Sequence, residues 1–309
     1  MGISTGTLLV YNKTALERIF SETAGLIAVH AEDEDRKNER KKLIEGRTDV
    51  AAHAFYRDDI TALLATKLSV ELARKTGHRL HILHLTSAIE ADYLSDICNL
   101  PSKAEGHPII TTEVLPQHLT FDETDVDEQG VRLQMNPPIR YKHDRETLWQ
   151  RLVDGTIQCI ATDHAPHTLE DKLKGFPAAP SGMPGVETSL PVMLNYVNQG
   201  RCSIEDVVRW MSTNVADCYR MIGKGKLEVG YDGDIVLVDM NHSAVVEDEN
   251  SWARVGWNPF RGRELTGWPV LTVVDGIPVF ERSAGTGQKG RLLVEPGAVG
   301  KPLLMEPWK

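Results

Sequence analysis

The sequence predicts an α/β fold, namely part of a (β/α)8 barrel of the TIM type followed by a small β domain. Over the first two thirds of the 309 residues, short apolar runs alternate with segments of helical periodicity, a rhythm typical of parallel sheets. Three of the apolar runs lead to histidine or aspartate. About four βα units can be counted, whereas a closed barrel has eight. We therefore expect about the last four units of a barrel.

Four short strands are expected in the barrel part. Each is a β-prone run that is too short for a typical helix and is bounded by turn-forming residues. They cover residues 26–29, 80–83, 109–115 and 157–161. Helices lie between them. A capping-box pattern at Thr14-x-x-Glu17 opens the first helix, Asp59 is expected to cap the next, and Gly77 to end it.

From residue 168 onward, the alternation of strand-like and helix-like segments gives way to other patterns. Residues 168–189 are rich in Gly, Pro and charge, and we expect a functional or disordered loop without secondary structure there. A helix opened by Ser203-x-x-Asp206 follows, and then strands at 234–239 and 271–280. The predicted divisions are a partial barrel at 1–222, a segment of a β domain at 223–285 and a tail at 286–309.

Composition narrows the class of protein. With 34 basic and 44 acidic residues, the net charge of −10 argues against binding to nucleic acid or to an acidic membrane surface. No apolar run approaches the roughly 20 residues of a membrane span, and the first residues lack the features of a secretory signal. The cysteines are scattered without a C-x-x-C pair, which favours reduced thiols and a cytoplasmic location. They are Cys98, Cys159, Cys202 and Cys218.

Three residues at strand ends form the strongest candidate site. His30, His84 and Asp163 each follow a predicted strand, and the carboxyl ends of parallel strands converge on one rim. Two imidazoles and a carboxylate there indicate a zinc site of the hydrolytic kind, in which the carboxylate can also accept a proton. Alternatively, the histidines are ordinary buried residues and Asp163 caps a turn. Recurrence at three strand ends favours the metal site, with His81 packed beneath it.

Further residues are candidates for binding a substrate. Asn136 precedes two prolines on a stiff loop and could present its amide to a carboxylate or an imide, although such a residue is often only a turn former. His167 follows Pro166, which favours an extended turn, so its side chain could face the same pocket. A surface position for His167 is equally compatible with the spacing. The glycines around Gly182 could offer backbone groups to a planar ring.

Eight ordered segments carry a specific resemblance. They are VHAEDED at 29–35, HILHLTS at 81–87, TEVLPQHL at 112–119, NPPIR at 136–140, ATDHAPH at 161–167, SGMPGVET at 181–188, VGYDGDIVLVD at 229–239 and WNPFRG at 257–262. With these segments, the chain resembles the C-terminal two thirds of the dihydroorotases, zinc enzymes of the amidohydrolase superfamily that act in pyrimidine biosynthesis. The resemblance extends over essentially all residues from the start to about position 280.

The resemblance implies roles for individual residues. His30 and His84 would ligate one zinc ion, and Asp163 would ligate a second and act as general base and acid. Asn136 and His167 would hold the substrate, with backbone groups near Ser181 and Gly182 contacting its ring. The implied reaction is the reversible closure of N-carbamoyl-L-aspartate to dihydroorotate. A metal-activated water attacks the ring amide in the hydrolytic direction, and Asp163 moves the proton.

The chain also departs from the family pattern. The family has an H-x-H pair after its first barrel strand and often a bridging lysine or aspartate, and none of the eleven histidines here forms such a pair. Two zinc ions need more ligands than remain. We therefore expect an N-terminally truncated dihydroorotase, and its activity and folding as a separate chain stay open at this point.

Two alternatives stay in view, one from a different class of protein and one from the same class. One is a non-catalytic, dihydroorotase-like scaffold subunit, which would associate with aspartate transcarbamoylase. The other is a hydrolase of the allantoinase or dihydropyrimidinase type. The NPPIR segment and the Ala-Pro-His that ends at His167 favour a dihydroorotase. The expected partners are a small-molecule substrate and, as an assembly, a homodimer.

Overall fold

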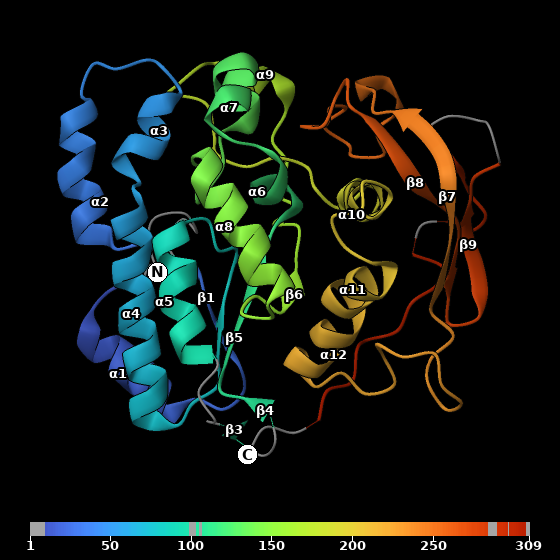
Figure 1. Ribbon diagram of the computed structural model, residues 1–309, viewed down its shortest axis with the longest axis horizontal. Coiled ribbons are helices and arrows are strands. Elements are labelled where there is room, and N and C mark those ends of the chain that lie inside the picture. Colours follow the sequence, from blue (N-terminus) through green and yellow to red (C-terminus); the bar gives the residue numbers. More distant parts are fainter. Residues whose placement is uncertain (1–9, 99–102, 105–106, 284–288, 296, 307–309) are drawn as a thin grey trace. The chain divides into compact units, whose positions relative to one another are not determined.

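The computed structural model describes residues 10–98, 103–104, 107–283, 289–295 and 297–306 (Figure 1). The chain divides into two compact units. The first holds the described residues up to 163 together with 170–183, and the second holds 164–169 and 184–306. Each unit has its own sheet. The domain boundary expected at residue 222 rests on sequence character alone and stays a prediction.

The first unit is built on a four-stranded parallel sheet in the order β1-β2-β5-β6. Ile27 pairs with Leu80, Leu80 with Ile110, and Glu113 with Cys159. Most of these strand residues are buried, as in parallel sheets covered on both faces. The four predicted strands are therefore confirmed, as β1 (Ile27–Val29), β2 (Leu80–Ile82), β5 (Ile110–Val114) and β6 (Cys159–Ile160). The larger barrel that they would belong to stays a prediction.

Helices follow each strand of this sheet, and Figure 1 shows α4, α5 and α8 side by side on one face of it. They span Asp59–Thr76, Ala88–Cys98 and Lys142–Val153. The other elements of the first unit are α1 (Lys13–Glu22), α2 (Glu34–Lys41), η2 (Lys42–Ile44), α3 (Ala51–Tyr56), the strand pair β3 (Lys103–Ala104) and β4 (His107–Pro108), α6 (Pro116–Thr120), α7 (Glu123–Gln129) and η3 (Gly130–Leu133).

Two predicted helix starts need correction. The α1 helix begins after Asn12, whose side chain accepts the Ala15 N–H, and not at the Thr14 pattern. The α4 helix is capped by Asp58 and not by Asp59, because the backbone of Asp58 is extended and its carboxylate lies 2.9 Å from the Thr61 nitrogen. Gly77 ends α4 with φ of 71°, as predicted.

The predicted loop at 168–189 is not free of secondary structure. It contains a short helix, α9 (Leu169–Lys172), and α10 (Ser189–Asn198) begins at its end. The prediction was wrong because the polar Lys172 side chain is fully buried and donates to three backbone carbonyls. These contacts order the segment in a way that composition does not reveal.

The second unit combines helices with a four-stranded antiparallel sheet in the order β10-β9-β8-β7. Ser203 and Asp206 form the predicted capping box at the start of a helical stretch. The strand predicted at 271–280 is interrupted by Asp275 and Gly276, both at positive φ, a pair typical of a two-residue hairpin turn. The elements are α10, α11 (Ile204–Val208), the π-helical η4 (Arg209–Thr213), α12 (Asn214–Tyr219), β7 (Ile235–Val245), η5 (Asp248–Asn250), β8 (Glu264–Val274), β9 (Ile277–Glu281) and β10 (Arg291–Leu292).

Two expectations from composition can be compared with the structure. All four cysteines are reduced, as predicted. Within the described residues, none of the helices is both long enough and apolar enough to cross a membrane.

Candidate metal centre and its surroundings

The three predicted ligands all belong to the first unit and follow its strands. His30 comes directly after β1, His84 two residues after β2, and Asp163 three residues after β6. The backbone at His84 has φ of 35° and that at Asp163 has φ of 40°, a left-handed conformation that turns the chain sharply at the strand end. The strands therefore deliver these side chains to one edge of the sheet, as the sequence predicts.

The imidazole rings of His30 and His84 are in direct contact. Nδ1 of His30 lies 2.9 Å from Nε2 of His84, and the ring planes stand at 75° to one another. Burial, together with the nearby His30, lowers the pKa of His84 to about 4, and the carboxylate of Asp163 opposes the shift. Burial also lowers the pKa of His30. Both rings are therefore neutral near pH 7, which is the protonation state of a metal ligand.

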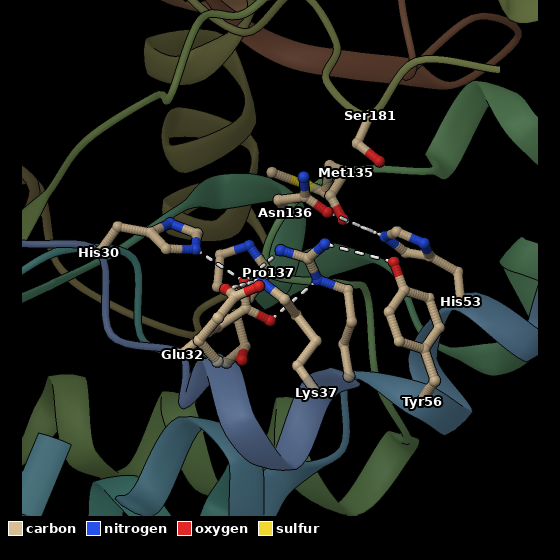
Figure 2. A network of polar contacts seen from close by, with 12 residues as sticks. His30, Glu32, Lys37, His53, Tyr56, Met135, Asn136, Pro137 and Ser181 are labelled. Carbon is tan, nitrogen blue, oxygen red and sulfur yellow. Dashed lines mark hydrogen bonds and ion pairs between the residues drawn. The ribbon is translucent and has the colours of Figure 1, made fainter. Parts of the chain in front are cut away.

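The second nitrogen of His30 is bound to a buried carboxylate. Nε2 lies 2.7 Å from Oε2 of Glu32, and Nε of Arg57 donates to Oε1 of Glu32 at 2.9 Å (Figure 2). Burial would raise the pKa of Glu32, but the Arg57 guanidinium holds it well below its usual range. The ionised Glu32 thus fixes the proton of His30 on Nε2, which leaves the Nδ1 lone pair facing His84.

A second carboxylate supports His84 through its backbone. Oε1 of Glu113 accepts a hydrogen bond of 3.2 Å from the backbone N–H of His84, and Oε2 lies 3.0 Å from Nε2 of His81. His81 is fully buried in β2, and its Nδ1 lies 2.8 Å from the Thr111 hydroxyl. The expectation that His81 packs beneath the site is therefore confirmed.

The candidate substrate-binding residues Asn136, Ser181 and Gly182 are also in the first unit. Gln134 connects their two segments, because its side chain donates to the Ser181 hydroxyl at 3.3 Å and its carbonyl accepts the Gly182 N–H at 2.9 Å. Nζ of Lys172 donates to the carbonyls of Gln134 and Gly182 at 2.8 and 3.0 Å. The segment that carries Asn136 and the Gly-rich segment are therefore held side by side.

His167 belongs to the second unit. Its carbonyl accepts a hydrogen bond of 2.8 Å from the Trp257 indole, and Nδ1 of the neighbouring His164 accepts the Gly185 N–H at 3.1 Å. Its role toward a substrate stays a prediction.

The donor set can be compared with the needs of a metal ion. Among the described residues, no three His, Cys, Asp or Glu side chains already stand where they could hold one. The chemistry of the donors nevertheless fits zinc: two neutral imidazoles bring one nitrogen each within 2.9 Å of the other, and the charge of Asp163 acts on one of them. His30 and His84 are thus the residues that could hold the ion, with Asp163 beside them.

Several residues around the site escaped the sequence analysis. Glu32 could have been found, because residues two apart in an extended segment lie on the same side and the sequence reads His30-Ala31-Glu32. No pattern marks the others. They are His53, Arg57, Glu113 and Lys172.

The fold and the residues at the strand ends agree with one family of enzymes. The chain belongs to the amidohydrolase family, whose model matches residues 13–279. It is similar to the dihydroorotase of Halobacterium salinarum, with 34% identity over 279 residues, which are 90% of this chain and 62% of the relative. The dihydroorotase of Methanosarcina mazei is 32% identical over 94% of this chain and 64% of its own length. The chain thus spans less than two thirds of these curated relatives.

Solved structures of a hydantoinase and a dihydropyrimidinase are also similar to this chain. The L-hydantoinase (dihydropyrimidinase) of Arthrobacter aurescens superposes with a TM-score of 0.85 at 30% identity, over 94% of this chain and 64% of that protein. The dihydropyrimidinase of Brevibacillus agri superposes with a TM-score of 0.82 at 27% identity, over 90% and 62%. The α/β amidohydrolase fold is therefore common to the chain and these structures.

Proposed function

We propose that this chain contributes His30, His84 and Asp163 to the metal centre of a cyclic amidohydrolase, and that the enzyme is a dihydroorotase. The observation that carries the proposal is the convergence of Nδ1 of His30 on Nε2 of His84 at 2.9 Å, at the ends of neighbouring parallel strands. Relatives at 31–37% identity named dihydroorotase support the choice of substrate.

Individual residues of the chain have different roles in the proposed reaction. A bound zinc ion polarises a carbonyl group and acidifies water. His30 and His84 would hold the ion, in place of the hydrogen bond between them. Glu32 keeps the lone pair of His30 pointing inward, since it occupies the other nitrogen.

Asp163 moves the proton of the reaction. In hydrolysis, a C–O bond forms at the ring carbonyl and the C–N bond to the ring nitrogen breaks. Asp163 accepts the proton that the attacking water loses and delivers it to the departing nitrogen, so that one water is consumed and N-carbamoyl-L-aspartate is released. Ring closure is the reverse. Asn136 and the segment of Ser181 and Gly182 bind the substrate.

A cyclic-ureide hydrolase of the hydantoinase type is the second candidate. The structure of the Arthrobacter aurescens L-hydantoinase (dihydropyrimidinase), at 30% identity, favours it. The two candidates differ in the ring that they open, and not in the metal chemistry.

Purified protein supplied with zinc tests the proposal. We expect hydrolysis of dihydroorotate in preference to hydantoin, dihydrouracil and allantoin, and its loss in Asp163→Asn. A preference for hydantoin or dihydrouracil would support the second candidate instead. Zinc binding without hydrolysis of any ring would contradict the catalytic proposal and favour a scaffold role. Failure to bind zinc would contradict the metal centre itself.

A further inference from the structure

Beside the metal centre, the helix α3 carries a buried histidine that the proposed reaction does not use. His53 is 3% exposed, and its ring lies edge-on to Tyr56 and Phe176 at centroid distances of 5.5 and 6.1 Å. Its Nδ1 atom has no hydrogen-bond partner among the described residues. In the described part of the chain, the polar contacts of the ring are made by the other nitrogen, Nε2, and Figure 2 shows this nitrogen directed at Asn136.

The two contacts of Nε2 determine where its proton lies. Nε2 is 3.0 Å from the backbone carbonyl of Met135 and 3.0 Å from the side-chain amide of Asn136. A backbone carbonyl can only accept a hydrogen bond, so Nε2 must carry the hydrogen. The ring is then a neutral imidazole whose bare nitrogen is Nδ1, the atom that lacks a partner.

The orientation of the Asn136 amide follows from that proton. The oxygen and nitrogen of an asparagine amide have nearly the same shape, so the neighbouring donors and acceptors decide which way it faces. Because Nε2 of His53 is a donor, the Asn136 atom 3.0 Å away from it must be the oxygen. The amide NH2 group therefore faces away from His53.

The NH2 group of Asn136 is available to a ligand. Asn136 is half-buried, whereas residues 133–135 and 137–140 on either side of it are buried. Its only polar side-chain contact among the described residues is the one that its oxygen makes to His53. A donor left open at this point can bind an oxygen that accepts, such as a carboxylate or a ring carbonyl.

We propose that His53 is a positioning residue: it fixes the Asn136 amide so that the protein offers a hydrogen-bond donor, and not an acceptor, to the substrate. The site then selects a ligand with a carboxylate or carbonyl oxygen at this position and rejects one that presents an N–H there. This inference rests on the proposed function, since it assigns Asn136 to the substrate. Burial lowers the pKa of His53 to about 3, so the ring stays neutral throughout the pH range of the assay.

Two substitutions of His53 distinguish the effect of its N–H donor from the effect of its aromatic ring. His53→Phe keeps an aromatic ring in the space but removes the N–H, and His53→Gln restores a donor on a flexible side chain. We expect KM for dihydroorotate to rise by roughly 10- to 100-fold in His53→Phe, with a smaller change in kcat. His53→Gln should recover most of the loss. His78→Phe, at a histidine that packs against Phe20 away from the site, is the matched control.

A double variant tests whether His53 acts through Asn136. Asn136→Ala should raise KM as much as His53→Phe does, and the two together should cost no more than either alone. Additive losses, or an unchanged KM in His53→Phe beside a raised one in Asn136→Ala, would overturn the inference while leaving the proposed function intact. Equal losses in His53→Gln and His53→Phe would do the same.

The tautomer of His53 gives a readout that needs no activity. Long-range 1H–15N correlation spectra of the full chain between pH 5 and 8 should show a neutral ring with the proton on Nε2. A proton on Nδ1 would overturn the inference even if no substrate were turned over. If the wild-type protein opens no ring but His53 shows the Nε2–H tautomer, the proposed function fails and the orientation of Asn136 stands.

Discussion

Nδ1 of His30 lies 2.9 Å from Nε2 of His84, although the two residues are 54 positions apart in the sequence. Neighbouring parallel strands bring them together, since Val29 of β1 pairs with Ile82 of β2. A hydrogen bond between two neutral imidazoles needs one proton between the nitrogens, whereas a shared cation needs both lone pairs. The proton of this hydrogen bond and a metal ion therefore compete for the position between the two nitrogens.

Removing either imidazole should abolish tight zinc binding. In His30→Ala and His84→Ala we expect the dissociation constant for zinc to rise by more than about 100-fold, since loss of a ligand exceeds the effect of losing an outer partner. Competition with a coloured chelator measures it. His143→Ala, at an exposed histidine, is the control. Unchanged affinity in His30→Ala would show that zinc binds elsewhere.

Glu32→Gln should weaken zinc binding by about 10- to 100-fold, because the neutral amide no longer favours the proton on Nε2 of His30. Titration of the metal-free protein with zinc measures the change. Glu39→Gln alters the same charge on an exposed side chain and should bind zinc as the wild type does. Equal effects of the two substitutions would show that overall charge, and not the contact with His30, is responsible.

Lys172→Met should destabilise the protein by roughly 1–3 kcal/mol, because buried carbonyls lose their donor. The carbonyls are those of Gln134, Pro180 and Gly182. Chemical unfolding of both proteins at pH 7 measures the difference. A variant as stable as the wild type would show that Lys172 does not hold these segments together.

The same lysine predicts a dependence of stability on pH. Burial lowers the pKa of Lys172 from 10.5 to about 7. Between these values the unfolded chain keeps a proton that the folded protein has released, so the free energy of unfolding contributed by this group rises with pH. We expect the wild type to gain stability relative to Lys172→Met from pH 7 to 10. A difference that stays constant over this range would contradict the lowered pKa.

Gly267→Ala should destabilise the second unit more than Gly276→Ala does. Both glycines have positive φ, 104° and 79°, so alanine is strained at either position by roughly 1–2 kcal/mol. At Gly267, in β8, a Cβ would also lie 2.6 Å from Cβ of Leu194 in α10, whereas Gly276 has open space around it. Thermal unfolding compares them. Equal losses would mean that α10 can move away from β8 at little cost.

Much of the fold could be predicted because the pattern is local. The four parallel strands are apolar runs between helices, and His30, His84 and Asp163 follow from strand ends meeting at one edge. The hairpin turn at Asp275 and Gly276 also has a local signature, but β-prone residues on both sides hid it.

The supporting contacts could not be predicted, because they join distant parts of the chain. Arg57 reaches Glu32 across 25 residues, Lys172 reaches Gln134 across 38, and Asn136 is 83 residues from His53. Nothing in the sequence near any of these residues indicates its partner. A buried polar group finds its hydrogen-bond partner among atoms that come together only on folding. The folded structure is therefore needed to identify these partners.

The left-handed backbone at His84 and Asp163 has a consequence for evolution in the laboratory. Glycine would adopt these conformations without the penalty that a side chain brings, which is of order 1–2 kcal/mol at each position. At His84, which is buried and bonded to His30, loss of the side chain would cost more than this strain, but Asp163 is only half-buried. A screen that rewards heat resistance alone would therefore favour glycine at Asp163 and would discard one of the three donors as it succeeded. Selection of this protein for thermal stability needs a parallel selection for bound metal.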